Sequence, residues 1–207
     1  MKKGMCIAYE VGDSLYLNIT NRCSNSCDFC IRNNGDGAYG SDSLWLTREP
    51  TVSEITDAID KHDLTKYAEL VFCGYGEPTE RLYDMLTVSK RVKEKHVIPI
   101  RLNTNGQANL IWEKDVTPEF CGVIDTVSIS LNAADKDKYD TICHSKFGKD
   151  AFESILDFAK KVKNYVQNVA FSVVDASLSA DEIEKCCEIS SSLGIPLRVR
   201  EYIGREA

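Results

Sequence analysis

The chain has 207 residues, of which 43% are hydrophobic and 28% charged, and its formal net charge is −7. This size and composition predict one globular domain over residues 1–207 and exclude a disordered chain. No apolar run approaches the roughly 20 residues that span a bilayer, and no signal-peptide core follows the basic start. The acidic balance argues against a protein whose whole surface binds nucleic acid, although it leaves room for a local basic patch.

Strand and helix patterns alternate along the chain. Strands are predicted at Ser14–Thr20, Glu69–Cys73, Ile98–Thr104, Thr126–Leu131, Val169–Val174 and Leu197–Ile203. Helices are predicted from Thr51, which has capping-box spacing to Glu54, to about Lys66, and at Arg81–His96, within Gln107–Phe120, at Phe152–Tyr165 and at Ala180–Leu193, where Gly194 and Pro196 follow. Six strands separated by helices predict right-handed βαβ units and a parallel sheet.

Several of these strands alternate polar and apolar residues, unlike a parallel strand that is covered on both faces. Polar faces are predicted for Ser128, Ser130 and Asn132; for Arg101, Asn103 and Asn105; for Arg198, Arg200 and Tyr202; and for Tyr16, Asn18 and Thr20. Helices must cover the apolar faces, so the polar faces are expected to line a concave space. We therefore predict an α/β fold, a partial (βα)6 TIM-like open barrel with parallel strands around a polar ligand. The alternative is an open sheet with one solvated face.

A tight group of cysteines, Cys23, Cys27 and Cys30, follows the first predicted strand. The loop at the carboxyl end of a barrel strand is where active sites form. Three thiolates can hold three irons of a [4Fe–4S] cube and leave the fourth iron open. The alternatives are a structural zinc site, which Cys6 or Cys73 would have to complete through folding, and three incidental thiols. The total of nine cysteines is odd, so they cannot all form intramolecular disulfides. The lack of a signal-peptide core predicts a cytoplasmic location, and in a reducing compartment clustered thiols are more often metal or cluster ligands than bridges.

The spacing of these cysteines, with Phe29 before the third, resembles the radical S-adenosylmethionine (radical SAM) superfamily. Three later stretches at strand ends also resemble its motifs: Gly74-Tyr75-Gly76-Glu77-Pro78, Leu102-Asn103-Thr104-Asn105-Gly106 and Ser128-Ile129-Ser130-Leu131-Asn132. The resemblance implies that Cys23, Cys27 and Cys30 bind a [4Fe–4S] cluster and that S-adenosylmethionine binds its open iron. It further implies cofactor contacts from Phe29, Gly74, Tyr75, Gly76, Glu77, Pro78, Asn103, Asn105, Ser128, Ser130 and Asn132. Gly74 and Gly76 are expected to permit unusual backbone angles and close approach of a ligand, and Glu77 to offer its charge to an ammonium group.

The resemblance implies reductive cleavage of S-adenosylmethionine to a 5′-deoxyadenosyl radical, which abstracts hydrogen from a small-molecule or nucleotide-like substrate. It also implies an external one-electron donor of the flavodoxin or ferredoxin type. Two alternatives stay open: an activase that installs a glycyl radical on a partner protein, and a non-catalytic zinc or iron–sulfur binding protein. Within the superfamily, residues 13–23, 71–78 and 199–202 are most similar to small standalone proteins encoded beside a TatD-type nuclease, which implies association with such a nuclease.

The second ligand of the barrel has few sequence signals. Arg198 and Arg200 are expected to face inward, where guanidinium groups suit a carboxylate or phosphate of the substrate or of S-adenosylmethionine. The alternative is an internal ion pair with Asp175 or Glu77.

The segment Ile31–Pro50, which contains an exposed-looking Trp45, is expected to be a mobile cover or a plain surface loop. Because the chain stops soon after the last strand, the barrel mouth is expected to be open at the side. Cys121 and Cys143 are interpreted as isolated thiols, and Cys186 and Cys187 as a core and a surface thiol.

Overall fold

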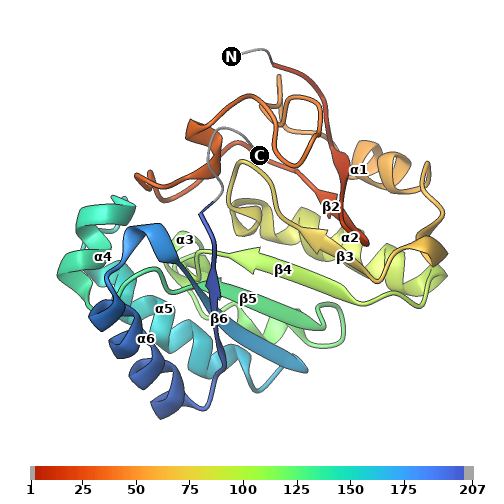
Figure 1. Cartoon of the computed structure of the whole chain (residues 1–207). Coiled ribbons are helices and arrows are strands. Elements are labelled where there is room, and N and C mark those ends of the chain that lie inside the picture. Colours follow the sequence, from red (N-terminus) through yellow and green to blue (C-terminus); the bar gives the residue numbers. More distant parts are fainter. Residues whose placement is uncertain (1–2, 203–207) are drawn as a thin grey trace.

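The structure is a computed structural model that describes residues 3–202, and its centre is a seven-stranded sheet in the order β1-β2-β3-β4-β5-β6-β7 (Figure 1). The strands are β1 (Ala8–Val11), β2 (Ser14–Leu17), β3 (Glu69–Phe72), β4 (Ile100–Thr104), β5 (Thr126–Ser130), β6 (Asn168–Val174) and β7 (Leu197–Arg200). Strands β2 to β7 pair in parallel with their neighbours in sequence. Strands β1 and β7 are the edges, so the sheet is not closed. The predicted α/β partial barrel is confirmed.

The sequence analysis missed β1. This strand pairs antiparallel with β2, and the pairing of Val11 with Ser14 leaves a two-residue turn at Gly12 and Asp13. Gly12 has a φ of 59°, which glycine adopts without strain and which tight hairpin turns require. The last strand was predicted to reach Ile203, which lies outside the described residues.

The helices are α1 (Val52–Ile59), α2 (Leu82–Lys95), α3 (Ala108–Ile111), α4 (Lys136–Cys143), α5 (Asp150–Val162) and α6 (Ala180–Leu193), and they lie on the outer side of the curved sheet (Figure 1). Helix α6 has its predicted bounds, and Gly194 follows it in the left-handed conformation. Helix α1 begins with the predicted capping box but ends at Ile59, and a separate 3₁₀ turn covers Leu64–Lys66. Helix α4 was not predicted. Further 3₁₀ turns lie at Ile31–Asn33, Pro78–Arg81, Thr117–Phe120 and Asp175–Ser177.

The alternation of side chains along the strands positions the core and the site. Leu102, Ile129 and Leu131 are fully buried in the main core cluster. On the opposite face, Arg101, Asn103, Ser128 and Ser130 are half-buried and Asn132 is buried, and all five line a cavity. Asn18 and Thr20 do not follow the pattern, because both are buried beyond the end of β2 and bind other parts of the chain. None of the described helices is long and apolar enough to cross a membrane.

Candidate functional site

A cavity of about 520 Å³ lies on the inner side of the sheet. This volume suits a cofactor or a small substrate. It is lined by every site residue expected from sequence except Pro78: Cys23, Cys27, Phe29, Cys30, Gly74, Tyr75, Gly76, Glu77, Asn103, Asn105, Ser128, Ser130, Asn132, Arg198 and Arg200. Pro78 is buried at the first position of the 3₁₀ turn that follows Glu77. The fold thus gathers residues from the ends of five strands around one space.

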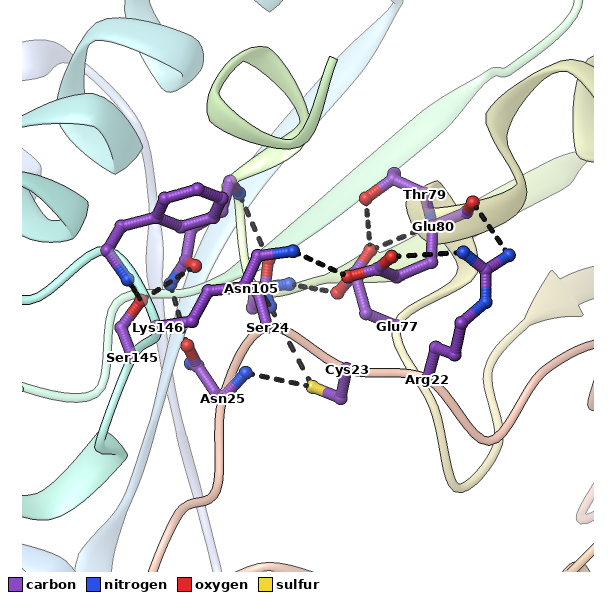
Figure 2. A network of polar contacts seen from close by, with 12 residues as sticks. Arg22, Cys23, Ser24, Asn25, Glu77, Thr79, Glu80, Asn105, Ser145 and Lys146 are labelled. Carbon is purple, nitrogen blue, oxygen red and sulfur yellow. Dashed lines mark hydrogen bonds and ion pairs between the residues drawn. The ribbon is translucent and has the colours of Figure 1, made fainter. Parts of the chain in front are cut away.

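The three cysteines follow β2, and their thiols are half-buried at the cavity wall. The sulfur of Cys23 accepts hydrogen bonds from the Asn25 N–H at 3.4 Å and the Asn105 side-chain amide at 3.9 Å (Figure 2). Burial, followed by the nearby Glu77, raises the pKa of Cys23 to about 12, and burial also raises the pKa of Cys30. Metal ligation must therefore displace a proton from each thiol.

The three thiols do not form a ready-made site for a single metal ion. Among residues 3–202, no three cysteine, histidine or carboxylate side chains converge closely enough to hold one metal ion. Structural zinc needs such convergence, whereas the ligands of a cube each bind a different iron and stand further apart.

Cys143 was interpreted as isolated, and this is wrong. Its buried thiol, in the last turn of α4, makes a hydrogen bond with the Cys27 thiol, and this contact followed by burial raises the pKa of Cys27. The carbonyls of Ile142 and Cys143 also accept hydrogen bonds from the N–H groups of Asp28 and Ser26, each at 3.0 Å. The end of α4 therefore supports the cysteine loop. The contact joins residues that are far apart in sequence, and the polar sequence of α4 gave no helical pattern to reveal it.

A buried polar network that the sequence analysis also missed holds the same loop. The Asn25 side-chain amide donates to the Tyr139 hydroxyl at 2.8 Å, and the Gln107 amide donates to both Asn25 and Tyr139 at 2.8 and 2.9 Å. Ser145 donates to Gln107 at 3.0 Å, and Asn105 donates to Ser24 at 2.8 Å. Buried networks whose members are satisfied rigidify their surroundings, so the positions of the thiols are fixed by protein contacts.

The structure requires glycine at positions 74 and 76 for a different reason from the expected one. Gly74 and Gly76 are not among the described glycines that have a positive φ. A Cβ at Gly76 would lie 2.3 Å from the carbonyl oxygen of Thr20, and one at Gly74 would lie within 2.2 Å of the Asn18 side chain. The close approach observed is therefore between the loop after β3 and the chain that leads into the cysteines.

The Glu77 carboxylate is buried and directed at its own loop (Figure 2). One oxygen accepts from the Thr79 N–H and hydroxyl and from the Thr104 hydroxyl, and the other accepts from the Asn105 N–H at 2.7 Å. Burial raises the pKa of Glu77, although these hydrogen bonds oppose the shift. The carboxylate therefore fastens the ends of β3 and β4 together, and its expected contact with an ammonium group stays a prediction.

Tyr75 packs against the segment Ile31–Pro50. Its hydroxyl donates to the carbonyls of Gly35 and Gly37 at 3.1 and 2.9 Å, and its ring meets Trp45 edge-on at 5.2 Å. Trp45 is half-buried rather than exposed, and its indole nitrogen has no hydrogen-bond partner in the described chain. Buried Leu44 and Ala38 complete this second apolar cluster, so the segment is a packed wall of the cavity.

The remaining walls are polar. Arg101 makes an ion pair with Glu69 at 2.7 Å and donates to the Tyr16 hydroxyl and to Asn103, each at 3.2 Å. On the neighbouring strand β5, Ser128 pairs with Asn103, and Ser128 and Ser130 line the cavity. The buried side-chain oxygen of Asn132 has no partner in the described part of the chain. An unpartnered buried oxygen at a cavity wall fits a ligand that brings a hydrogen-bond donor.

The ion-pair alternative for Arg198 and Arg200 is not found among residues 3–202. The oxygens of Glu77 are taken by the donors described above, and Asp175 accepts the N–H groups of Ala176 and Tyr202. Both arginines line the cavity from β7 and are exposed.

Comparisons with known proteins agree with this geometry. A family model described as the Radical SAM superfamily matches residues 17–190. The "Probable GTP 3′,8-cyclase" of Methanocaldococcus jannaschii is 23% identical over 190 residues, which cover 92% of this chain and 59% of that relative. The chain therefore spans about three fifths of the length of this relative.

Solved structures share the fold. Streptococcus suis SuiB bound to its precursor peptide SuiA superposes with a TM-score of 0.70 at 18% identity, over 95% of this chain and 40% of SuiB. SuiB bound to S-adenosylmethionine gives a TM-score of 0.64 at 17% identity, over 91% of this chain and 40% of SuiB. A radical SAM methyltransferase from Sphaerobacter thermophilus gives 0.63 at 16% identity, over 96% of this chain and 70% of its own.

Proposed function

The chain belongs to the radical SAM superfamily of enzymes, and from that premise we propose that Cys23, Cys27 and Cys30 hold its cluster and that the cavity binds S-adenosylmethionine beside a substrate. A [4Fe–4S] cluster and S-adenosylmethionine are the cofactors that this family implies. One observation carries the proposal: the three thiols share a single cavity with Gly74, Gly76 and Asn132. We further propose that residues 1–207 act as one radical SAM core domain, which the continuous main core supports.

When bound, the reduced cluster and S-adenosylmethionine supply a 5′-deoxyadenosyl radical that abstracts hydrogen from the substrate. The chain's part is to place and shield the reactants. The network around Asn25 and Gln107 fixes the cysteine loop, and Asn105 orients the Cys23 sulfur. The unpartnered oxygen of Asn132 and the hydroxyls of Ser128 and Ser130 offer acceptors and donors to hydroxyl groups of S-adenosylmethionine.

The substrate proposed is a small or nucleotide-like molecule. A closed cavity wall, built by the segment Ile31–Pro50 and Tyr75, favours a small substrate over a glycyl-radical partner protein. The electron donor proposed is of the flavodoxin or ferredoxin type, in a reducing cytoplasm. Membership of the TatD-associated subgroup stays a prediction, and co-purification of a TatD-type nuclease with the tagged chain would support it.

Anaerobic reconstitution with iron and sulfide tests the proposed function. We expect about four irons per chain, the broad visible absorption of a [4Fe–4S] cluster, and formation of 5′-deoxyadenosine from S-adenosylmethionine after reduction with dithionite. A reconstituted chain that holds the cluster but does not cleave S-adenosylmethionine would refute the proposal that the chain is a radical SAM enzyme.

The assignment of the ligands is tested by Cys27→Ala. Losing one of three ligands should remove most of the bound iron and all cleavage of S-adenosylmethionine. Cys121→Ala is the matched control, because Cys121 is exposed and does not line the cavity. Full cleavage activity in Cys27→Ala would contradict the assignment.

A further inference from the structure

The part of the cavity that faces β6 and β7 is not used by the contacts proposed for the cluster and S-adenosylmethionine. We propose that it anchors a second, anionic ligand, whose carboxylate or phosphate group binds between Arg198, Arg200 and the hydroxyl of Tyr39. This inference rests on the proposed function and names the chemical class of its substrate.

The two arginines are placed as a pair. Arg198 lies opposite Ser172 and Arg200 lies opposite Val174 in the pairing of β7 with β6. Alternate residues of a strand share a face, and about 7 Å separates their Cα atoms, since each residue rises about 3.3 Å. Ser172, Val174 and both arginines line the cavity. Two planar guanidinium forks on one face can supply several donors to the oxygens of one anion.

The positive charge of this pair is not neutralised within the described chain. Three other acidic groups line the cavity besides Glu77: Asp13, Glu69 and Glu201. Glu69 is paired with Arg101 at 2.7 Å, and Asp13 accepts the Ser14 hydroxyl at 3.2 Å. Glu201 follows Arg200 in the chain and makes no ion pair with either arginine among residues 3–202. Two unpaired guanidinium groups at a cavity wall favour an anionic ligand.

Tyr39 completes the anchor from another part of the cavity wall. It lies in the segment Ile31–Pro50, and the charges of Arg200 and Arg198 reach its hydroxyl, opposing the rise in pKa that burial causes. Its φ is 54°, in the left-handed region that is strained for a residue with a bulky side chain, and Gly40 follows at 76°. Backbone strain of this kind persists at binding sites, where it aims a side chain. The Tyr39 hydroxyl makes no hydrogen bond with the described part of the chain, so it is available as a donor.

The pair lies on a different strand from the residues proposed to contact S-adenosylmethionine. The residues proposed to contact that cofactor lie at the ends of β3, β4 and β5. Strand β6 lies between them and the arginines of β7. An anion held at β7 is therefore assigned to the molecule that shares the cavity with the cofactor, and the affinity of the double variant for S-adenosylmethionine tests this assignment.

Calorimetry on the reconstituted protein, saturated with S-adenosylmethionine, tests the anchor with inorganic pyrophosphate and with succinate as probes. We expect at least one of them to bind, and the Arg198→Gln, Arg200→Gln double variant to bind it about tenfold more weakly or worse, as loss of hydrogen bonds to charged groups predicts. Tyr39→Phe should weaken binding by a smaller factor. Arg91→Gln, an exposed arginine of α2 outside this cavity, is the control and should bind like wild type. Preference for pyrophosphate identifies a phosphorylated substrate, and preference for succinate a carboxylated one.

Three results would overturn the anchor. The first is a wild-type protein that binds neither anion, and the second is a double variant that binds the preferred anion as tightly as wild type. The third is a double variant that loses affinity for S-adenosylmethionine, because the arginines would then hold the carboxylate of that cofactor. Each result leaves the proposed function intact if the wild type still carries the cluster and forms 5′-deoxyadenosine. The circular dichroism of each variant establishes that it is folded.

Discussion

Gly76 has two roles at once, since it lines the cavity and lets the loop after β3 lie against the chain that leads to the cysteines. The oxygens of Thr20 and Arg22 lie 2.3 and 2.6 Å from the position that a Cβ would occupy. The Glu77 N–H also donates to the Arg22 carbonyl at 2.8 Å. The distance between the two loops is therefore set by the missing side chain, and the same distance positions Cys23.

Gly76→Ala should displace the cysteine loop. Because the opposing atoms are backbone, the clash cannot be relieved by a side-chain rotation, and we expect a loss of about 1–3 kcal/mol in the free energy of unfolding. Urea denaturation of the cluster-free protein measures this loss, and iron content after reconstitution should fall with it. Gly35→Ala is the control, since its Cβ would meet only one oxygen at 3.8 Å. Equal stability of the two variants would show that the loops are not held at this distance.

Sequence can identify a site residue when the residue belongs to a short local motif. The cysteine spacing and the glycines after β3 are short motifs, and the cavity contains both. The contact between Cys27 and Cys143 joins residues more than 100 positions apart, and the hydrogen bond from Gln107 to Tyr139 joins residues more than 30 positions apart. The periodicity of polar and apolar residues does not reveal such contacts, because they form only when the barrel brings the loops together. Likewise, the alternation along the strand predicts that Asn18 faces the cavity, but its side-chain amide donates hydrogen bonds to two backbone carbonyls elsewhere in the chain.

At the scale of elements, capping boxes define the starts of α1 and α6. The Thr51 and Ser179 side chains each accept a hydrogen bond from the backbone N–H of the glutamate three residues later. The side chain of that glutamate in turn accepts a hydrogen bond from the backbone N–H of the cap residue. Helix α6 was predicted with its bounds because the cap and Gly194 give independent signals at both ends. Helix α4 has the N-cap Asp135 but a short and polar sequence, so its existence depends on packing against α5 and the cysteine loop.

The capping glutamates predict a loss of stability in acid. The pKa of Glu54 is lowered to about 2, first by Arg48 and then by the Thr51 N–H, and that of Glu182 is lowered to about 2 by the Ser179 N–H and then by Lys138. A carboxylate with a lowered folded-state pKa stabilises the fold above its ordinary pKa of 4.5, and this contribution is lost as the pH falls toward 2. In urea denaturation, Glu182→Gln should be less stable than wild type at pH 6, and the difference should vanish near pH 2. Glu184→Gln, an exposed carboxylate on the same helix, should track wild type throughout. A difference for Glu182→Gln that persists unchanged to pH 2 would contradict this account.

At the scale of the whole molecule, the barrel is open between β1 and β7, and the segment Ile31–Pro50 covers part of that opening. Its Asn34 accepts a hydrogen bond from the Tyr202 hydroxyl beyond β7 at 3.2 Å, while Leu44 and Leu46 are buried near β2. The sheet is open at the side as expected, and this segment covers part of the opening. Sequence suggested a mobile cover because glycines are frequent in the segment, but Tyr75 and Trp45 anchor it through contacts that only the fold creates.

This anchoring makes a prediction about how the wall opens. Tyr75→Phe removes the hydroxyl shared between the carbonyls of Gly35 and Gly37 and leaves the ring packing in place. One such hydrogen bond contributes about 1 kcal/mol, so the opening equilibrium of the segment should rise about fivefold. Trypsin sites at Arg32 and Arg48 lie near the two ends of the segment, and cleavage there should accelerate by the same factor when opening is fast relative to cleavage. Tyr83→Phe, an exposed tyrosine of α2 outside the cavity, provides the matched control. Cleavage of Tyr75→Phe at the wild-type rate would mean that the apolar contacts of Trp45 and Leu44 hold the wall closed on their own, and a rise in both variants would point to global unfolding instead.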